Sequence, residues 1–340
     1  MDMSYVKERI EEEISRKLDI KHFSSTTETL HIVDLGCSIG PDTYSAVQDI
    51  IDVIELKYIS EGLIVQIPDF LVFFNDFASN DFNTLFSSFP PNKKYLAAGV
   101  PGSFYQRLFA AGFLHFVYSS NSLQWLSKVP EEVEDKNSPA WNKGKVIYSS
   151  AQKEVVDAYS TQYREDMESF LCARAEELVL GGMMVLLMPG LSDGTPHSKC
   201  SHCMLYDLLG SCLLDMAQME LVNEERVDTF NYPIYIASPK ELEELVKKNG
   251  CFSIERLEMV TCLIRDVETP GVEVYTKHLR DGMQGPIKEH LGVTSNEDPT
   301  DEMHALFYRS LNFHCHSLLT MEDLSEGSGC VALYYCPSNV

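Results

Sequence analysis

The chain has 340 residues, of which 44% are hydrophobic, enough for a sizeable core in one large domain or two. Its 51 acidic residues outnumber the 27 lysines and arginines, which gives a formal net charge of −24. Such a surface repels phosphate backbones and anionic lipid, so the composition argues against nucleic acid and membranes as partners. A pocket with its own local field can still bind a small anion.

Targeting and metal signals are weak. No apolar run approaches the roughly 20 residues needed to span a bilayer, and the charged, helix-periodic first segment has no signal-peptide core. We therefore expect a soluble cytoplasmic protein whose ten cysteines are mostly buried free thiols. The cluster at 197–203 (HSKCSHC) has a CxxC but no second pair at zinc-finger spacing, and the cluster at 314–316 (HCH) puts its two histidines on one face of a strand or apart on a helix. A transition-metal site is therefore disfavoured at both.

Hydrophobic periodicity predicts the elements in chain order. Apolar residues four apart predict a helix over 4–20, and amphipathic patterns predict helices over 43–59 and 152–180. Seven apolar segments predict strands: 30–36, 69–76, 94–104, 113–120, 183–190, 251–260 and 329–336.

Strands that alternate with helices predict a mostly parallel sheet with helices on both faces. Ligands of such sheets lie beyond the carboxyl ends of the strands, which here carry Asp34, Asp76, Ser103 and the segment after Ser120. We expect residues 1–190, 246–264 and 328–340 to form the core. Residues 191–245 and 265–327 would form a helical cap.

The stretch from His31 to Tyr44, HIVDLGCSIGPDTY, has the pattern of a strand, a tight turn and a helix N-terminus. Its two glycines do not fit the G-x-G-x-x-G fingerprint of dinucleotide sites. A nucleoside fits better, because Asp34 and the turn can hold an ammonium group and Asp76 can accept both ribose hydroxyls. S-Adenosylmethionine has these parts and no phosphate. A helix-capping role is the alternative for such an acid.

Five further segments follow this turn in order and make the pattern specific: FFNDFASNDFNTLF (73–86), GVPGSFYQRLF (99–109), LHFVYSSNSLQWLSKVP (114–130), SPAWNKGKVI (138–147) and VDTFNYPIYIASPKELEELV (227–246). Together with DLGCSIGPDT, they resemble the plant SABATH methyltransferases, which methylate carboxylates such as salicylate, jasmonate and farnesoate, or nitrogens in the caffeine pathway. The resemblance implies a Rossmann-like class I methyltransferase sheet of seven mostly parallel strands with a helical cap, S-adenosylmethionine as cofactor, a plant origin and a homodimer.

The resemblance assigns the cofactor site to the strand ends. Asp34 and Cys37 match the methionyl end, and Asp76 matches the acid that binds the ribose. Asp42 stands where the family usually has Asn. Its carboxylate would either repel the carboxylate of the cofactor or cap the next helix. The adenine would lie against Phe77, Ser103 and Phe104. Core packing is the alternative for Phe104.

The substrate side matches a family segment that reads SNSLQW here. Trp125 would donate its indole N–H to a carboxylate oxygen of the substrate, a small acid. Asn121 and Gln124 would shape the pocket, with Asn121 replacing a common Tyr. From the cap the resemblance adds Leu205, Tyr206 and, in a less certain alignment, Leu279. Ordinary helix packing explains Leu205 and Tyr206 nearly as well.

Some family members hold a magnesium ion near the cap. Its ligands would be Asn142, Asp228, the Phe230 carbonyl and Asn231, all hard oxygen donors. One carboxylate among neutral oxygens makes a weak site, so a structural or crystal-condition role is as reasonable as a catalytic one.

The N-terminal lid of the family, GG-x-G-x-x-S-Y-x-x-N-S-x-x-Q, has no aligned counterpart, and we expect part of the cofactor lid and half of the carboxylate clamp to be absent. Methyl transfer to a carboxylate needs no general base, since this group is ionised at neutral pH. The leading hypothesis is therefore a carboxyl methyltransferase of a small apolar acid. The alternatives are N-methylation of a planar heterocycle and a catalytically impaired relative that only binds cofactor or a partner.

Overall fold

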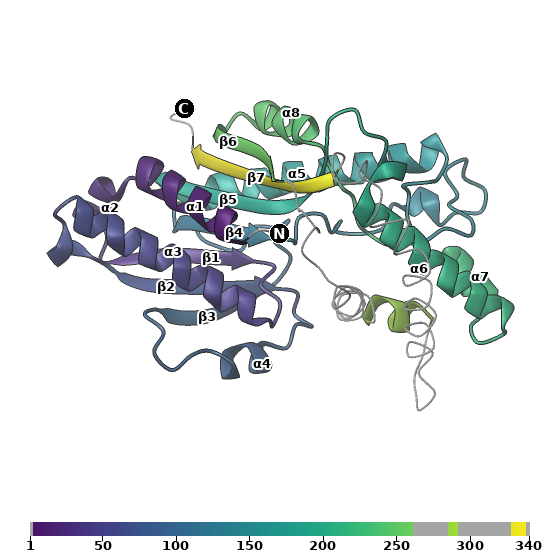
Figure 1. Ribbon diagram of the computed structural model, residues 1–340, viewed down its shortest axis with the longest axis horizontal. Helices are drawn as coiled ribbons and strands as arrows, with labels where there is room; N and C mark the ends of the chain where they lie inside the picture. The colour runs from purple at the N-terminus through teal and green to yellow at the C-terminus, as the bar shows by residue number, and fades with distance from the viewer. Residues whose placement is uncertain (1–2, 261–284, 292–327, 338–340) are drawn as a thin grey trace.

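The computed structural model describes residues 3–260, 285–291 and 328–337, and Figure 1 shows their arrangement. One sheet carries helices on both faces, which confirms the predicted α/β class. The strands lie within or around the apolar segments that predicted them. Their bounds are β1 Thr29–Leu35, β2 Asp69–Asp76, β3 Leu96–Pro101, β4 Leu114–Ser120, β5 Leu178–Leu191, β6 Phe252–Val260 and β7 Ser328–Pro337.

The strand order is β3-β2-β1-β4-β5-β7-β6. Strands β1 to β5 pair in parallel, whereas β7 lies between β5 and β6 and is antiparallel to both. The chain passes from β1 outward to β2 and β3, and then returns to β4 on the other side of β1. The carboxyl ends of β1 and β4 therefore form the point where the direction of winding reverses, the usual ligand position in such sheets.

Side chains of β1 alternate between two cores. Ile32 packs with Val6, Ile10 and Ile14 of α1 (Met3–Lys17), as the four-residue spacing predicted, and with α3 (Pro41–Ser60) and α2 (Ile20–Thr26). Val33 points to the opposite core, which includes α5 (Lys153–Glu177) and α8 (Pro239–Asn249). The two helical layers on either side of the sheet are visible in Figure 1.

The end of α5 differs from its prediction. The helical pattern extended to residue 180, but β5 begins at Leu178, whose backbone is already extended. A Cβ on Gly181 would lie 3.0 Å from Asp19 Cβ, and one on Gly182 would lie 3.0 Å from the His115 carbonyl oxygen. The two glycines therefore let the first part of β5 approach its neighbours closely, and the strand starts before the apolar run.

The remaining elements lie around the sheet. No helix in the described ranges is both long and apolar enough to cross a membrane. In Figure 1, α6 and α7 lie beyond one end of the sheet, in the part of the chain for which a cap is predicted. The cap residues 265–284 and 292–327 lie outside the described part. The bounds are α4 Phe82–Ser87, α6 Ser201–Gln218 and α7 Glu224–Thr229, the 3-10 turns Ile64–Gln66, Glu131–Val133 and His197–Lys199, and a helical turn at 285–291.

Candidate active site

The turn after β1 is built on Gly36, which has a φ of +76°. Its N–H and that of Cys37 both donate to the Asn75 carbonyl oxygen at the end of β2, at 2.9 and 3.0 Å. A Cβ at Gly36 would lie 2.2 Å from Ser122 Oγ, and that hydroxyl donates to the Gly36 carbonyl at 3.0 Å. The ends of β1 and β2 and the segment after β4 therefore meet at one glycine that no larger residue can replace.

Two acids lie next to this turn. Asp34 is 3% exposed, and burial together with the charge of Asp76 raises its pKa from 3.8 to about 8. The Asp76 carboxylate is held on both oxygens, since Ser38 N–H donates to Oδ2 and Phe77 N–H donates to Oδ1, each at 2.7 Å. A buried acid beside a fixed carboxylate ionises readily only when a positive group lies against it. The pair is therefore suited to an ammonium group and to hydroxyl donors.

The end of β3 joins the same edge. The Asn75 amide donates to the carbonyls of Val100 and Gly102 at 2.8 and 2.9 Å, and Gly102 N–H donates to the Asp76 carbonyl at 2.9 Å. These bonds place Ser103 directly beside the strand end that carries Asp76. The Ser103 hydroxyl accepts from Tyr105 N–H at 3.3 Å.

Phe104 lies between the core and the turn. The residue is 6% exposed, and its ring packs against Tyr105 and Phe170, with centroids 4.7 and 6.4 Å away. Its Cε1 also lies 3.6 Å from where a Gly36 Cβ would be. Phe104 therefore makes the core contacts that were the alternative to a role at the adenine, and its ring also reaches the turn. Phe77, which directly follows the carboxyl end of β2, is 52% exposed.

The predicted substrate segment follows β4 and is held from two sides. Asn121 has a φ of +53°, and its carbonyl accepts from the Gln124 amide at 2.7 Å. The Gln124 carbonyl accepts from Tyr235 N–H at 2.8 Å, and Trp125 forms a bridge with Ile234. The backbone on either side of Trp125 is therefore fixed against the strand-like segment at 232–236.

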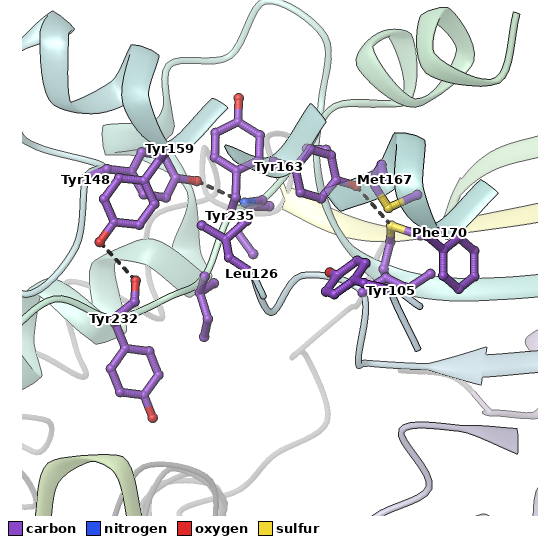
Figure 2. Close-up of a cluster of buried hydrophobic side chains, with 14 of the residues drawn as sticks. Tyr105, Leu126, Tyr148, Tyr159, Tyr163, Met167, Phe170, Tyr232 and Tyr235 are labelled. Atoms are coloured by element: carbon purple, nitrogen blue, oxygen red, sulfur yellow. Dashed lines mark hydrogen bonds between the residues drawn. The ribbon is translucent and has the colours of Figure 1, made fainter. Parts of the chain in front are cut away.

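Contacts between aromatic rings connect Trp125 to α6, which lies in the predicted cap. The Trp125 ring lies 5.3 Å from that of Tyr232, and Tyr232 stacks on Tyr206 of α6 at 5.5 Å. Leu205 and Tyr206 are half-buried against the same core, so helix packing also explains them. Figure 2 shows Tyr232 with the buried tyrosines 148, 159, 163 and 235, and Tyr159 donates to the Tyr232 carbonyl at 3.0 Å.

Of the predicted magnesium ligands, Asn142 and Asn231 are in direct contact. The Asn142 amide N–H donates to Asn231 Oδ1 at 2.8 Å, and its own Oδ1 is buried without a hydrogen-bond partner among the described residues. Asp228 Oδ1 lies 3.9 Å from where a Cβ on Gly144 would be, and Phe230 is buried beside Tyr232. The described part of the chain contains no group of three or more His, Cys, Asp or Glu residues that could hold a metal. The cluster at 197–203 therefore does not form such a group.

Three predicted positions lie outside what the structure describes: the side chain of Asp42 in the first turn of α3, Leu279, and the cluster at 314–316. Sequence reasoning missed Asn75, Ser122 and Tyr232, which hold the turn and connect Trp125 to α6. A polar residue at the buried end of the β2 run, and a tyrosine within FNYPIY, were the available signals.

Comparison with known proteins supports the family resemblance. Residues 1–321 match a family described as SAM dependent carboxyl methyltransferase. A loganic acid O-methyltransferase of Catharanthus roseus is 41% identical over 310 residues, 90% of this chain and 81% of that protein. A farnesoic acid carboxyl-O-methyltransferase of Arabidopsis thaliana is 45% identical over 255 residues, 75% of this chain and 72% of that protein. A solved structure of loganic acid methyltransferase with SAH superposes with a TM-score of 0.90 at 38% identity, and covers 98% of this chain and 92% of that one.

Proposed function

Because this chain belongs to the SABATH family of S-adenosylmethionine-dependent carboxyl methyltransferases, we propose that it methylates the carboxylate of a small, largely apolar acid. The product would be the methyl ester. The observation that carries the proposal is the meeting of Asp34, Asp76 and the Gly36 turn at the switch point of the sheet, one strand away from Trp125.

The donors at the switch point fit the cofactor. Asp34 would hold the ammonium group of the methionyl part, because a cation relieves the cost of ionising this buried acid. Cys37 and the first turn of α3, which includes Asp42, would border that part. Asp76, fixed by two backbone N–H groups, would accept the ribose hydroxyls. Ser103, Phe104 and Phe77 would surround the adenine.

When bound, S-adenosylmethionine supplies a methyl group on a positively charged sulfur, and a carboxylate oxygen takes this methyl as the carbon–sulfur bond breaks. An ordinary carboxylic acid, with a pKa of about 4, is already ionised at neutral pH, so no residue of this chain has to remove a proton. The work of the protein is then to align the oxygen with the methyl group and to exclude water.

Trp125 would align the acid. Its indole N–H is a donor without acceptor capacity, which suits one carboxylate oxygen. The tilted contact with Tyr232, which itself stacks on Tyr206, holds the ring, and the bridge to Ile234 holds its backbone. Asn121, Gln124, Leu205 and Leu279 would then set which acids fit.

We also propose a homodimer and a weak magnesium site at Asn142, Asp228, Phe230 and Asn231. The unpaired Asn142 Oδ1 is a free ligand oxygen, but Asn231 Oδ1 already accepts from Asn142, so the donor set fits an ion only in part. No step of the reaction is assigned to the ion.

Removing divalent ions with EDTA should therefore leave kcat within about twofold of its original value, as measured by ester formation. Light scattering, which measures the molar mass in solution, tests the dimer.

The deciding experiment measures calorimetric binding of S-adenosylhomocysteine (SAH), followed by a mass-spectrometric screen of acids for methyl ester formation. Trp125→Phe should lower kcat/KM by roughly tenfold or more while SAH affinity stays unchanged, since a hydrogen bond to a charged group contributes about 1.5–3 kcal/mol. The matched control is Trp141→Phe, which changes the only other tryptophan of the chain and should alter neither value.

Three results would contradict the proposal in different ways. No SAH binding would favour a protein that has lost its cofactor site. Methylation of planar heterocycles but not of acids would favour N-methylation. Full turnover by Trp125→Phe would remove the role assigned to the indole.

A further inference from the structure

The last turn of α5 ends in an ion pair with both side chains at 0% exposure. Arg174 Nη2 lies 2.7 Å from Glu177 Oε2. Arg174 is the largest fully buried side chain of the described structure, and burial lowers the pKa of its guanidinium. Replacing such a pair by apolar residues of similar volume often leaves stability unchanged or improves it. Stability alone therefore does not explain why these two charges are buried here.

Both side chains hydrogen-bond to one loop, residues 102–113, which connects β3 to β4 and has no helix or strand. Arg174 donates through Nη1 to the Phe104 carbonyl at 2.9 Å and through Nη2 to the Gln106 carbonyl at 3.0 Å. Glu177 Oε1 accepts from Leu108 N–H and from Phe109 N–H, the latter at 2.9 Å. Four backbone groups of an irregular segment are thus fixed by two side chains.

The ring contacts continue this arrangement toward the switch-point turn. The Arg174 guanidinium lies 5.2 Å from the centre of the Phe170 ring, and Phe170 meets Phe104 edge to face. Figure 2 shows Phe170 and Tyr105, the residue that follows Phe104, in the same buried cluster. Because Phe104 also reaches Gly36, the ion pair, the loop and the turn form one continuous set of contacts.

We propose that Arg174 and Glu177 are positioning residues for the cofactor: they hold the loop so that Ser103 and Phe104 are in place before the nucleoside binds. The inference rests on the proposed function, since it takes these two residues as the nucleoside contacts. A loop that adopts the binding conformation one tenth of the time binds its ligand about tenfold more weakly. Saturating cofactor would still select that conformation, so kcat would be kept.

The experiment compares Glu177→Gln with a matched control, Glu13→Gln. Glu13 is 1% exposed and pairs with Arg16 at 2.7 Å and with Arg256 at 3.0 Å, but it ties α1 to β6, away from the loop. Glu177→Gln should raise the SAH Kd and the KM for S-adenosylmethionine by roughly tenfold, with kcat and the KM for the acid unchanged. Glu13→Gln should lower Tm without changing either cofactor value.

A second variant removes both charges, in case the first does not fold. Arg174→Met with Glu177→Leu leaves no unpaired buried charge, so it should fold. Its Tm should be lower than that of the wild type, because four backbone groups of the loop lose their partners. We expect the double variant to show the same roughly tenfold loss of SAH affinity, together with faster hydrogen exchange at the amides of Leu108 and Phe109.

The outcomes separate the inference from the function on which it rests. Wild-type SAH affinity in the double variant would overturn the positioning role alone. A fall in kcat with no change in the cofactor KM would also overturn it, since the loop would then act on the chemistry and not on binding. Failure of the wild-type chain to bind SAH would overturn the proposed function, and the inference with it.

Discussion

Asp34 illustrates how one residue can couple the fold to its ligand. Burial and the neighbouring Asp76 raise its pKa to about 8, so in the free protein at neutral pH the group is mostly protonated. A raised pKa contributes stability that is fully present below the ordinary value of 3.8 and is lost as the pH rises through about 8. Binding of an ammonium group reverses this preference, because the cation favours the carboxylate.

The prediction for Asp34 is a proton released on binding. At pH 7 the binding of one SAH molecule should release close to one proton, whereas at about pH 9, where Asp34 is already ionised, it should release much less. Calorimetry in two buffers of different ionisation enthalpy measures this number. Asp34→Asn provides the control, since its unfolding free energy should lack the decline between about pH 4 and 8. Binding at pH 7 without proton release would contradict the assignment.

At the scale of elements, the junction of β1 and α3 depends on one glycine. Gly36→Ala forces a Cβ into a left-handed residue and to within 2.2 Å of Ser122 Oγ, so it should destabilise the protein by about 2–5 kcal/mol and weaken SAH binding. Gly40→Ala is the matched control. Gly40 has no atom within 4 Å of its added Cβ, and it precedes the first turn of α3 with a φ of −78°. Denaturant unfolding measures the loss of unfolding free energy in both variants. Equal losses would show that the turn does not depend on glycine at position 36.

The element pattern could be predicted where apolar residues follow a clear period or run. The whole of β2 was confirmed because its apolar run ends in Asn75 and Asp76, and the face of α1 with Val6, Ile10 and Ile14 was confirmed because these residues are spaced four apart. The end of α5 was wrong because Gly181 and Gly182 permit a strand where the helical pattern continues. Periodicity reports which face is buried and carries no information on such close backbone approaches.

The candidate site could be predicted where its residues lie at the ends of predicted parallel strands. Asp34 and Asp76 come together because parallel strands end at one edge. The Arg174–Glu177 pair could not be found in this way, since it lies about 70 residues from its loop and reads as ordinary helix surface in the sequence. Tyr232, between Trp125 and Tyr206, is likewise a long-range contact that no local pattern encodes.

At the scale of the whole molecule, the charge of −24 acts on the two substrates in opposite directions. S-Adenosylmethionine carries a net positive charge and is attracted, whereas a carboxylate is repelled. Raising the salt from about 0.01 to 0.15 M shortens the screening length from about 30 to 8 Å. The KM for S-adenosylmethionine should therefore rise and that for the acid should fall. SAH, which has no net charge, is the internal control, and parallel changes in both KM values would contradict the argument.

The place of β7 has a consequence for biosynthesis. This strand pairs with β5 on one side and with β6 on the other, yet it follows both of them in the chain. While the polypeptide is being made, β5 and β6 each keep an open edge of unpaired N–H and C=O groups until residues 328–337 have left the ribosome. Open edges invite pairing with other chains. Nascent molecules on a crowded polysome are therefore at greatest risk of aggregation in the interval between the emergence of residue 260 from the ribosome and the emergence of residue 337, and chaperone protection would matter most there.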